Sequence, residues 1–391
     1  MAPFHWKSTS IIVFAAFLLS SCSNSPKLVK TNRISKTESS FKSGDLKESE
    51  ELYPSYDTAV GDVPGFTSSP NPFLKDCPIK IDGAGFELRT DFSAGNALLL
   101  SSLFSGTEKD PQSVIELKLK TLGFKEIEWI INGSKGVFSF IASRDELTIA
   151  HFRGTSNIGG WIQDAKFFTR RSNGKDPTGL ITLDEGLDFK GWMHTGFYGS
   201  YHTVKNEFED KLKKLAKDKP LYFAGHSLGG ALTAIAAGRA KMNGLNVMGV
   251  YTAGQPRIGD REFSEDLFDK IGDRHFRLIY EDDLVARIPP TKDSADDFAK
   301  LAGRNQILST LASSAIKIAG YVHKSHHVNL TKAMRELQLE PPSPLLDLSF
   351  WRKWDSLLTG VATLASSKLI SDHTSMNYAC SLSSIIDNSR K

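Results

Sequence analysis

Residues 221–230 read Leu-Tyr-Phe-Ala-Gly-His-Ser-Leu-Gly-Gly and decide the fold of this 391-residue chain. The run from Leu221 to Ala224 is apolar without alternation, which is typical of a strand buried on both faces of a parallel sheet. From Leu228 onward, apolar residues recur at helical spacing. Glycine on both sides of Ser227 permits a turn too tight for side chains. The stretch predicts a strand that turns directly into a helix and raises the Ser227 hydroxyl above the sheet.

The Gly-x-Ser-x-Gly pattern in this strand–turn–helix context indicates a nucleophilic serine, Ser227. The N-terminus of the helix offers backbone N–H groups, that of Leu228 first, to a developing negative charge. A serine nucleophile needs a base and an orienting acid, which in α/β-hydrolases follow in the order Ser, Asp or Glu, His. A strand predicted at Phe276–Tyr280 ends in Glu281-Asp282-Asp283, at the carboxyl end where such sheets collect site residues. Residue chemistry alone does not choose among these three carboxylates.

Several motifs occur in the order found in the class 3 lipase family, the fungal triacylglycerol lipases and their bacterial and plant relatives. The likeness covers about residues 92–290 and resumes near the C-terminus. It implies an α/β-hydrolase fold, with a mostly parallel central sheet flanked by helices. The motifs resemble the family's oxyanion loop (Phe-Arg-Gly-Thr, 152–155), nucleophile elbow (225–230), the following strand and turn (252–260) and D-x-V-x-x-[IL]-P-P segment (283–290).

The resemblance assigns the two remaining members of a catalytic triad. It selects Asp283 as the acid, and Asp372-His373 resembles the terminal Asp-His segment that holds the base. The chain order also admits His323, which resembles a family Tyr-x-His without catalytic role. It admits His326 and His327 too, a pair whose polar context is typical of a surface. We therefore predict His373 as the base. His194 and His226 fit family positions as packing or loop-fixing residues.

The oxyanion is expected to bind the backbone N–H of Leu228 and the residue Thr155. Residues 147–152 read as a strand that Gly154-Thr155 breaks, where a second backbone donor is expected. An ordinary turn is the alternative. Residues 156–166 place their apolar side chains on one helical face and resemble the family's short lid. Two glycines there weaken a helix by about 1 kcal/mol each, which a mobile cover tolerates; a fixed surface helix is the alternative.

The interval between Pro290 and His373 is longer than in the compact fungal members. Residues 295–320 and 345–369 read as helices, so we predict a helical insert over 291–372 before the C-terminus. An apolar stripe on the second helix, around Trp351 and Trp354, is typical of core packing. The alternatives are that this stripe forms part of an acyl pocket or that it contacts a membrane. Tryptophan beside basic residues is favoured at membrane interfaces.

The N-terminus indicates the compartment. Residues 11–19 are apolar and would span about 13 Å as a helix, too short for a bilayer and typical of a signal peptide. Leu-Ser-Ser-Cys at 19–22 resembles a bacterial lipobox, in which Cys22 is lipidated; a conventional signal peptide is the alternative. We predict a lipoprotein signal peptide over 1–21, a flexible tether over 22–75 and a hydrolase domain over 76–391. By analogy with the sorting of lipoproteins in Gram-negative bacteria, Ser23 after the cysteine is expected to direct the protein to the outer membrane.

Composition and motif content also bear on the partners, cofactors and cysteine pairing to be expected. The net charge is +3 and the basic residues are scattered, so no nucleic-acid partner is expected. Neither metal-ligand spacing nor a phosphate loop occurs, so we expect no cofactor and no metal. Cys77 and Cys380 are either a disulfide in an oxidising compartment or two buried thiols. No pattern indicates the oligomeric state.

The motifs together predict a membrane-anchored serine hydrolase that cleaves lipid esters through an acyl-enzyme, like a triacylglycerol lipase. A phospholipase A1 or a soluble-ester esterase is the alternative among enzymes. A non-catalytic envelope lipoprotein that binds lipid is the alternative of a different class.

Overall fold

The computed structural model describes residues 86–104, 111–154, 169–171, 186–281, 283, 285–289, 291, 320–330, 338–340 and 372–389. The predicted signal peptide, the tether and the lid segment lie outside these residues, as do Cys22, Cys77 and Thr155. The described residues belong to one compact unit, 70–391.

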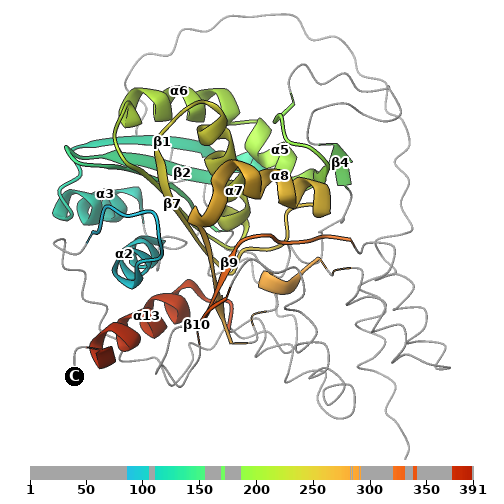
Figure 1. Cartoon of the computed structure of the whole chain (residues 1–391). Helices are drawn as coiled ribbons and strands as arrows, with labels where there is room; N and C mark the ends of the chain where they lie inside the picture. The colour runs from blue at the N-terminus through green and yellow to red at the C-terminus, as the bar shows by residue number, and fades with distance from the viewer. Residues whose placement is uncertain are drawn as a thin grey trace, which may run out of the picture. The chain divides into compact units, whose positions relative to one another are not determined.

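An eight-stranded sheet forms the centre of this unit (Figure 1). Its order is β1-β2-β3-β6-β7-β8-β9-β10, and each neighbouring pair from β3 to β9 is parallel. β1, β2 and β10 join by antiparallel pairings. β3, β6 and β8 are buried along their whole length, and the unalternating apolar run of β6 predicts this for that strand. The strands are β1 (Glu126–Asn132), β2 (Val137–Ser143), β3 (Thr148–Phe152), β6 (Leu221–His226), β7 (Val247–Ala253), β8 (His275–Tyr280), β9 (His326–Leu330) and β10 (Gln338–Glu340).

Helices cover both faces of the sheet (Figure 1). One hydrophobic cluster joins the sheet to α5 (Thr195–His202), α6 (Lys205–Ala216), α7 (Leu228–Met242) and α8 (Arg261–Ile271). A second joins the other face to α2 (Ala94–Phe104), α3 (Gln112–Thr121) and α13 (Ser375–Ser389). The predicted α/β-hydrolase fold is therefore confirmed, with α7 the helix that follows the turn at Ser227.

Short elements complete the described part of the chain. β4 (Thr169–Arg171) pairs with β5 (Trp192–His194), apart from the main sheet. Three 3₁₀ turns are η4 (Gly133–Lys135), η5 (Gly272–Arg274) and η6 (Val285–Arg287). None of the helices described is long and apolar enough to span a bilayer.

The interval 291–372 contributes β9 and β10 to the sheet, two strands that the sequence did not predict. The helices predicted there lie almost wholly outside the described residues. β9 pairs in parallel with β8, and the pairing places His327 opposite Arg277. The prediction that the pair His326-His327 lies on the surface is wrong for His327, which is 5% exposed. Its ring is buried because successive side chains of a strand point to opposite faces of the sheet.

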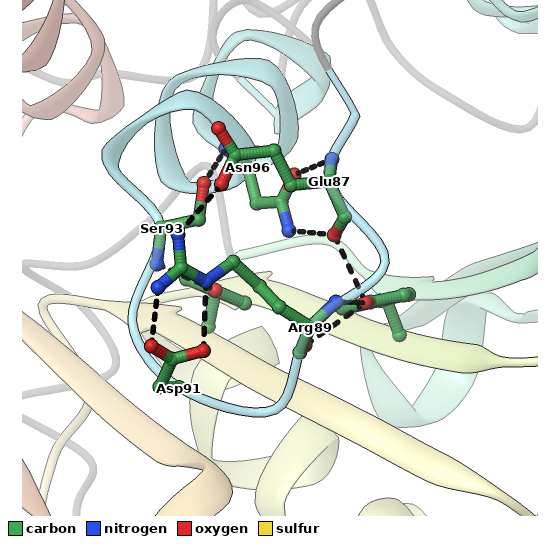
Figure 2. A network of polar contacts seen from close by, with 7 residues as sticks. Glu87, Arg89, Asp91, Ser93 and Asn96 are labelled. Atoms are coloured by element: carbon green, nitrogen blue, oxygen red, sulfur yellow. Dashed lines mark hydrogen bonds and ion pairs between the residues drawn. The ribbon is translucent and has the colours of Figure 1, made fainter.

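Polar contacts fix the segment that precedes α2 (Figure 2). The Ser93 hydroxyl caps α2 by accepting from the Asn96 N–H at 3.0 Å, and the Asn96 amide makes two hydrogen bonds of 2.7 Å with the Glu87 main chain. The Tyr222 hydroxyl donates to the Glu87 carbonyl at 3.1 Å, and the Ser93 N–H donates to the Tyr251 hydroxyl at 3.2 Å. These contacts attach the segment to β6 and β7.

Candidate active site

Ser227 forms the turn between β6 and α7 by itself. Its backbone has φ 58° and ψ −130°, a conformation that costs a non-glycine residue on the order of 1–3 kcal/mol. The Ser227 N–H donates to the Ala253 carbonyl at 2.9 Å, which anchors the turn to β7. Within the described residues, the Ser227 hydroxyl has no hydrogen-bond partner. A strained serine held at the carboxyl end of a parallel strand is the geometry that the motif predicts.

The glycines around Ser227 allow backbones to meet at this turn. A Cβ added to Gly225 would lie 2.2 Å from the Thr233 hydroxyl oxygen and 2.6 Å from the Gly229 carbonyl oxygen. A Cβ on Gly229 would lie 2.1 Å from the carbonyl oxygen of Phe152, at the end of β3. Any side chain at either position would push the turn away from β3 and from its own helix. Lack of space therefore explains why both motif positions are glycine.

Asp283 and His373 meet although 90 residues separate them in the chain. Asp283 follows β8, is fully buried, and its Oδ2 accepts from Nδ1 of His373 at 2.8 Å. The Val285 N–H donates to Oδ1 at 2.8 Å. Burial alone would raise the pKa of Asp283. The adjacent His373 and the hydrogen bonds from His373 and Tyr378 outweigh burial and hold that pKa below its ordinary value. The carboxylate therefore stays ionised beside the imidazole.

His226 places the His373 ring next to the serine turn. The two imidazoles stack with centroids 4.6 Å apart, and Nε2 of His226 lies 2.7 Å from the His373 carbonyl oxygen. His226 directly precedes Ser227, so His373, Asp283 and Ser227 belong to one buried cluster. The loop-fixing role predicted for His226 fits these contacts. His194, the other such residue, caps α5 by accepting from the Gly196 N–H at 3.0 Å.

Two further residues contact the pair without having been singled out as functional from the sequence. Tyr378, on α13, donates its hydroxyl hydrogen bond to Oδ2 of Asp283. Gly254 follows β7 with φ +57°, and a Cβ there would lie 2.7 Å from both Oδ2 of Asp283 and Cε1 of His373. Two sequence features could have indicated these residues: Tyr378 lies shortly after His373, and Gly254 directly follows a buried strand.

The chain leaving β3 runs against the serine turn. A Cβ on Gly154 would lie 3.0 Å from the His226 carbonyl oxygen and 3.2 Å from Cβ of Ser227. Thr155, the next residue, lies outside the described residues. On the other side of Ser227, Leu228 begins α7, where the first N–H groups have no partner within the helix. Gly154 and Leu228 therefore both lie next to Ser227, and the oxyanion role of Thr155 and the Leu228 N–H stays a prediction.

The alternative bases lie elsewhere. Within the described residues, no hydrogen bond joins His323, His326 or His327 to Asp283. His323 is buried, and burial followed by the nearby Arg277 holds its pKa well below the ordinary value. His326 lies 3.2 Å from the Asp273 carboxylate. The structure therefore brings only His373, of the four candidates, into contact with the predicted acid among the described residues.

The described residues contain no group of three His, Cys, Asp or Glu side chains arranged to hold a metal ion. Cys380 is buried on α13 and is disulfide-bonded, which decides between the two alternatives for this residue.

Comparison with known proteins shows what the chain is similar to. Residues 149–293 match the family model described as lipase (class 3). The chain is 27% identical over 167 residues to secreted mono- and diacylglycerol lipase 1 of Fusarium solani, covering 41% of this chain and 45% of that relative. It is 32% identical over 146 residues to a lipase of Rhizomucor miehei, covering 36% of each. It is 42% identical over 192 residues to triacylglycerol lipase OBL1 of Arabidopsis thaliana, covering 40% and 37%.

The matched segment spans less than half the length of each of these relatives. Among solved structures, that of Rhizomucor miehei triacylglyceride lipase is similar with a TM-score of 0.49 and 20% identity, covering 72% of this chain and 96% of that one.

Proposed function

We propose that this protein is a serine hydrolase of carboxylic lipid esters, similar in activity to the triacylglycerol lipases, because residues 149–293 match the class 3 lipase family model. The observation that carries the proposal is the 2.8 Å hydrogen bond between His373 and the buried Asp283, in a cluster with the strained Ser227. A serine, an ionised carboxylate and a histidine, which follow one another along the chain in that order, are the components of a hydrolytic triad.

The reaction follows from the contacts of these three residues. His373 takes the proton of the Ser227 hydroxyl as the oxygen attacks the acyl carbon. The ester C–O bond then breaks, His373 returns the proton to the leaving alcohol, and the acyl group stays on Ser227. Water, deprotonated by His373, attacks the acyl-enzyme. The bond between the acyl carbon and the Ser227 oxygen then breaks, the carboxylic acid leaves, and His373 returns the proton to Ser227. Asp283 holds the Nδ1–H tautomer and stabilises the imidazolium that forms twice in each cycle.

The oxyanion is assigned to the Leu228 N–H and to Thr155. Gly154 packed against Ser227 supports the assignment, since Thr155 follows it directly. Removing one such donor typically costs about 10²–10³ in kcat. Residues 156–166 are assigned to a lid, on the basis of their apolar face and their position after this loop.

A fluorophosphonate probe tests the function. Because such a probe reacts with an activated serine, it should label Ser227 in the wild-type protein and leave Ser227→Ala unlabelled. Comparing hydrolysis of a short-chain ester, emulsified triacylglycerol and phospholipid vesicles then identifies the substrate class. Absence of labelling in folded wild-type protein would leave only a lipid-binding role. Hydrolysis confined to phospholipid or to soluble ester would replace the triacylglycerol assignment.

We also propose that Cys22 anchors the protein in the cell envelope, at the outer membrane of a Gram-negative bacterium. The support is the lipobox-like segment 19–22, followed by a tether sequence. Cys22→Ala should abolish palmitate incorporation, because it removes the residue that is lipidated. Without the acyl chains, on which stable anchoring depends, the protein should leave the membrane fraction. Probe labelling of Ser227 should continue at the wild-type rate. Equal palmitate labelling of both proteins would contradict the proposal.

A further inference from the structure

Arg277, on β8, joins two loops that border the candidate active site. Its side chain is buried, with 1% of the residue exposed. Nη2 donates to the Gln255 carbonyl at 3.1 Å and to the Ala286 carbonyl at 3.0 Å. Gln255 follows Gly254, which contacts both Asp283 and His373, and Ala286 belongs to the loop that carries Asp283. One guanidinium therefore bonds both loops.

His327, from the neighbouring strand, holds the other end of this guanidinium. Nη1 of Arg277 donates to Nε2 of His327 at 2.9 Å, and the two residues are opposite each other in the β8–β9 pairing. The imidazole must be neutral to accept this bond. Burial, followed by the charge of Arg277, keeps the pKa of His327 well below its ordinary value. The acceptor is thus available at neutral pH.

Arg277 can be compared with Arg239, a second buried arginine, which bonds carboxylates rather than main-chain oxygens near the candidate site. Arg239, on α7, bonds the carboxylates of Glu209, at 2.9 Å from Nε, and of Asp188. In the described part of the chain, no carboxylate is hydrogen-bonded to Arg277. Nη1 bonds the neutral His327 ring, and Nη2 bonds two main-chain oxygens that flank the candidate site. A buried charge without a bonded counter-ion is costly, so its retention here calls for a function.

Arg257 ties the same two loops together further from Asp283. Its backbone N–H donates to the Ile288 carbonyl at 2.8 Å, and its Nη1 donates to the Pro289 carbonyl at 2.6 Å. The loop that carries Asp283 thus has several carbonyls bound by guanidinium and amide donors rather than by a sheet or helix. Arg277 is the donor that bonds Ala286, three residues from Asp283.

We propose that Arg277 is a positioning residue for ester hydrolysis: its paired bonds to the Gln255 and Ala286 carbonyls hold Asp283 at the distance at which it orients His373. The inference rests on the proposed triad and adds a residue to it that touches neither substrate nor serine.

Arg277→Met in the full chain tests the role, with Arg239→Met as the matched loss of a buried arginine. Misplacement of a catalytic group by about 1 Å costs about 10²-fold in rate, so Arg277→Met should lower kcat on a short-chain ester by about 10- to 100-fold. KM should change by less than about twofold, since no substrate contact is lost. Arg239→Met should lower the melting temperature and leave kcat of the folded protein within about twofold of wild type.

A double-mutant cycle separates positioning from a general effect. Because Arg277 acts through Asp283, adding Arg277→Met to Asp283→Asn should lower kcat by less than about twofold more. Full additivity, or wild-type kcat in folded Arg277→Met, would overturn the inference. If Arg277→Met does not fold, His327→Leu removes the acceptor that orients the guanidinium. Unchanged kcat in folded His327→Leu would then overturn it.

Probe labelling keeps this test apart from that of the function. Wild-type protein that is not labelled at Ser227 refutes the triad itself. Wild-type protein that is labelled, together with Arg277→Met labelled equally fast, refutes only the role of Arg277.

Discussion

Replacing His373 by alanine is expected to lower kcat on a short-chain ester by about four to six orders of magnitude, as severely as replacing Ser227. His373 is the histidine that bonds the buried Asp283, at 2.8 Å, and its ring stacks on His226 beside the serine turn. Members of a triad act as one unit, so their losses do not add. The double variant of Ser227 and His373 should therefore be little worse than either single one.

Purified variants are compared after circular dichroism has established that they fold. His323→Ala is the matched control, since His323 is also a buried histidine in the required chain order. It should cost less than about tenfold in kcat, through packing. Near-normal turnover in folded His373→Ala, with collapse in His323→Ala, would move the base to the segment before β9 and refute the triad proposed above.

The second large effect is loss of stability in mild acid. Burial lowers the pKa of His194 to about 4, and burial with the nearby Arg277 and His326 lowers that of His275 to about 3. The unfolded chain takes up these protons near pH 6.5, whereas the folded chain does not. Stability is therefore complete above pH 6.5 and falls as the pH drops toward the folded values, by about 1.4 kcal/mol per histidine and pH unit.

At pH 4.5 these two histidines together remove about 5 kcal/mol, comparable to the whole stability of many domains. His323 and His327, whose pKa values are also lowered by burial, act in the same direction. Urea unfolding between pH 7.5 and 4.5 measures the loss. His275→Gln should lose about 3 kcal/mol less over this range than the parent. A flat stability profile in the parent would refute the explanation.

The turn at Ser227 could be predicted because its causes are local. The apolar run of β6, the glycines and the spacing of α7 lie within one continuous stretch, and the structure adds only which backbones the glycines approach. The choice of Asp283 was different. Three adjacent carboxylates have the same chemistry, so the resemblance to a family was needed to select the one that the structure places against His373.

The rest of the site depends on contacts between distant segments. The role of Tyr378 rests on a hydrogen bond across 95 residues, which no local pattern records. β9 was missed because His326, His327 and Asn329 make its sequence polar. The strand forms because β8 and β10 pair with it, and the buried ring of His327 is bonded by Arg277. Tertiary pairing outweighed strand propensity here.

The spacing of the site along the chain has a consequence for biosynthesis. The contact between His226 and the His373 carbonyl spans 147 residues, so the serine turn emerges from the ribosome long before its base. At about 5–20 residues per second, the interval lasts roughly 7–30 s. During that time the nascent chain carries Ser227 without His373, the base of the proposed triad. The proposed triad is therefore complete only after the C-terminal part of the chain has been synthesised.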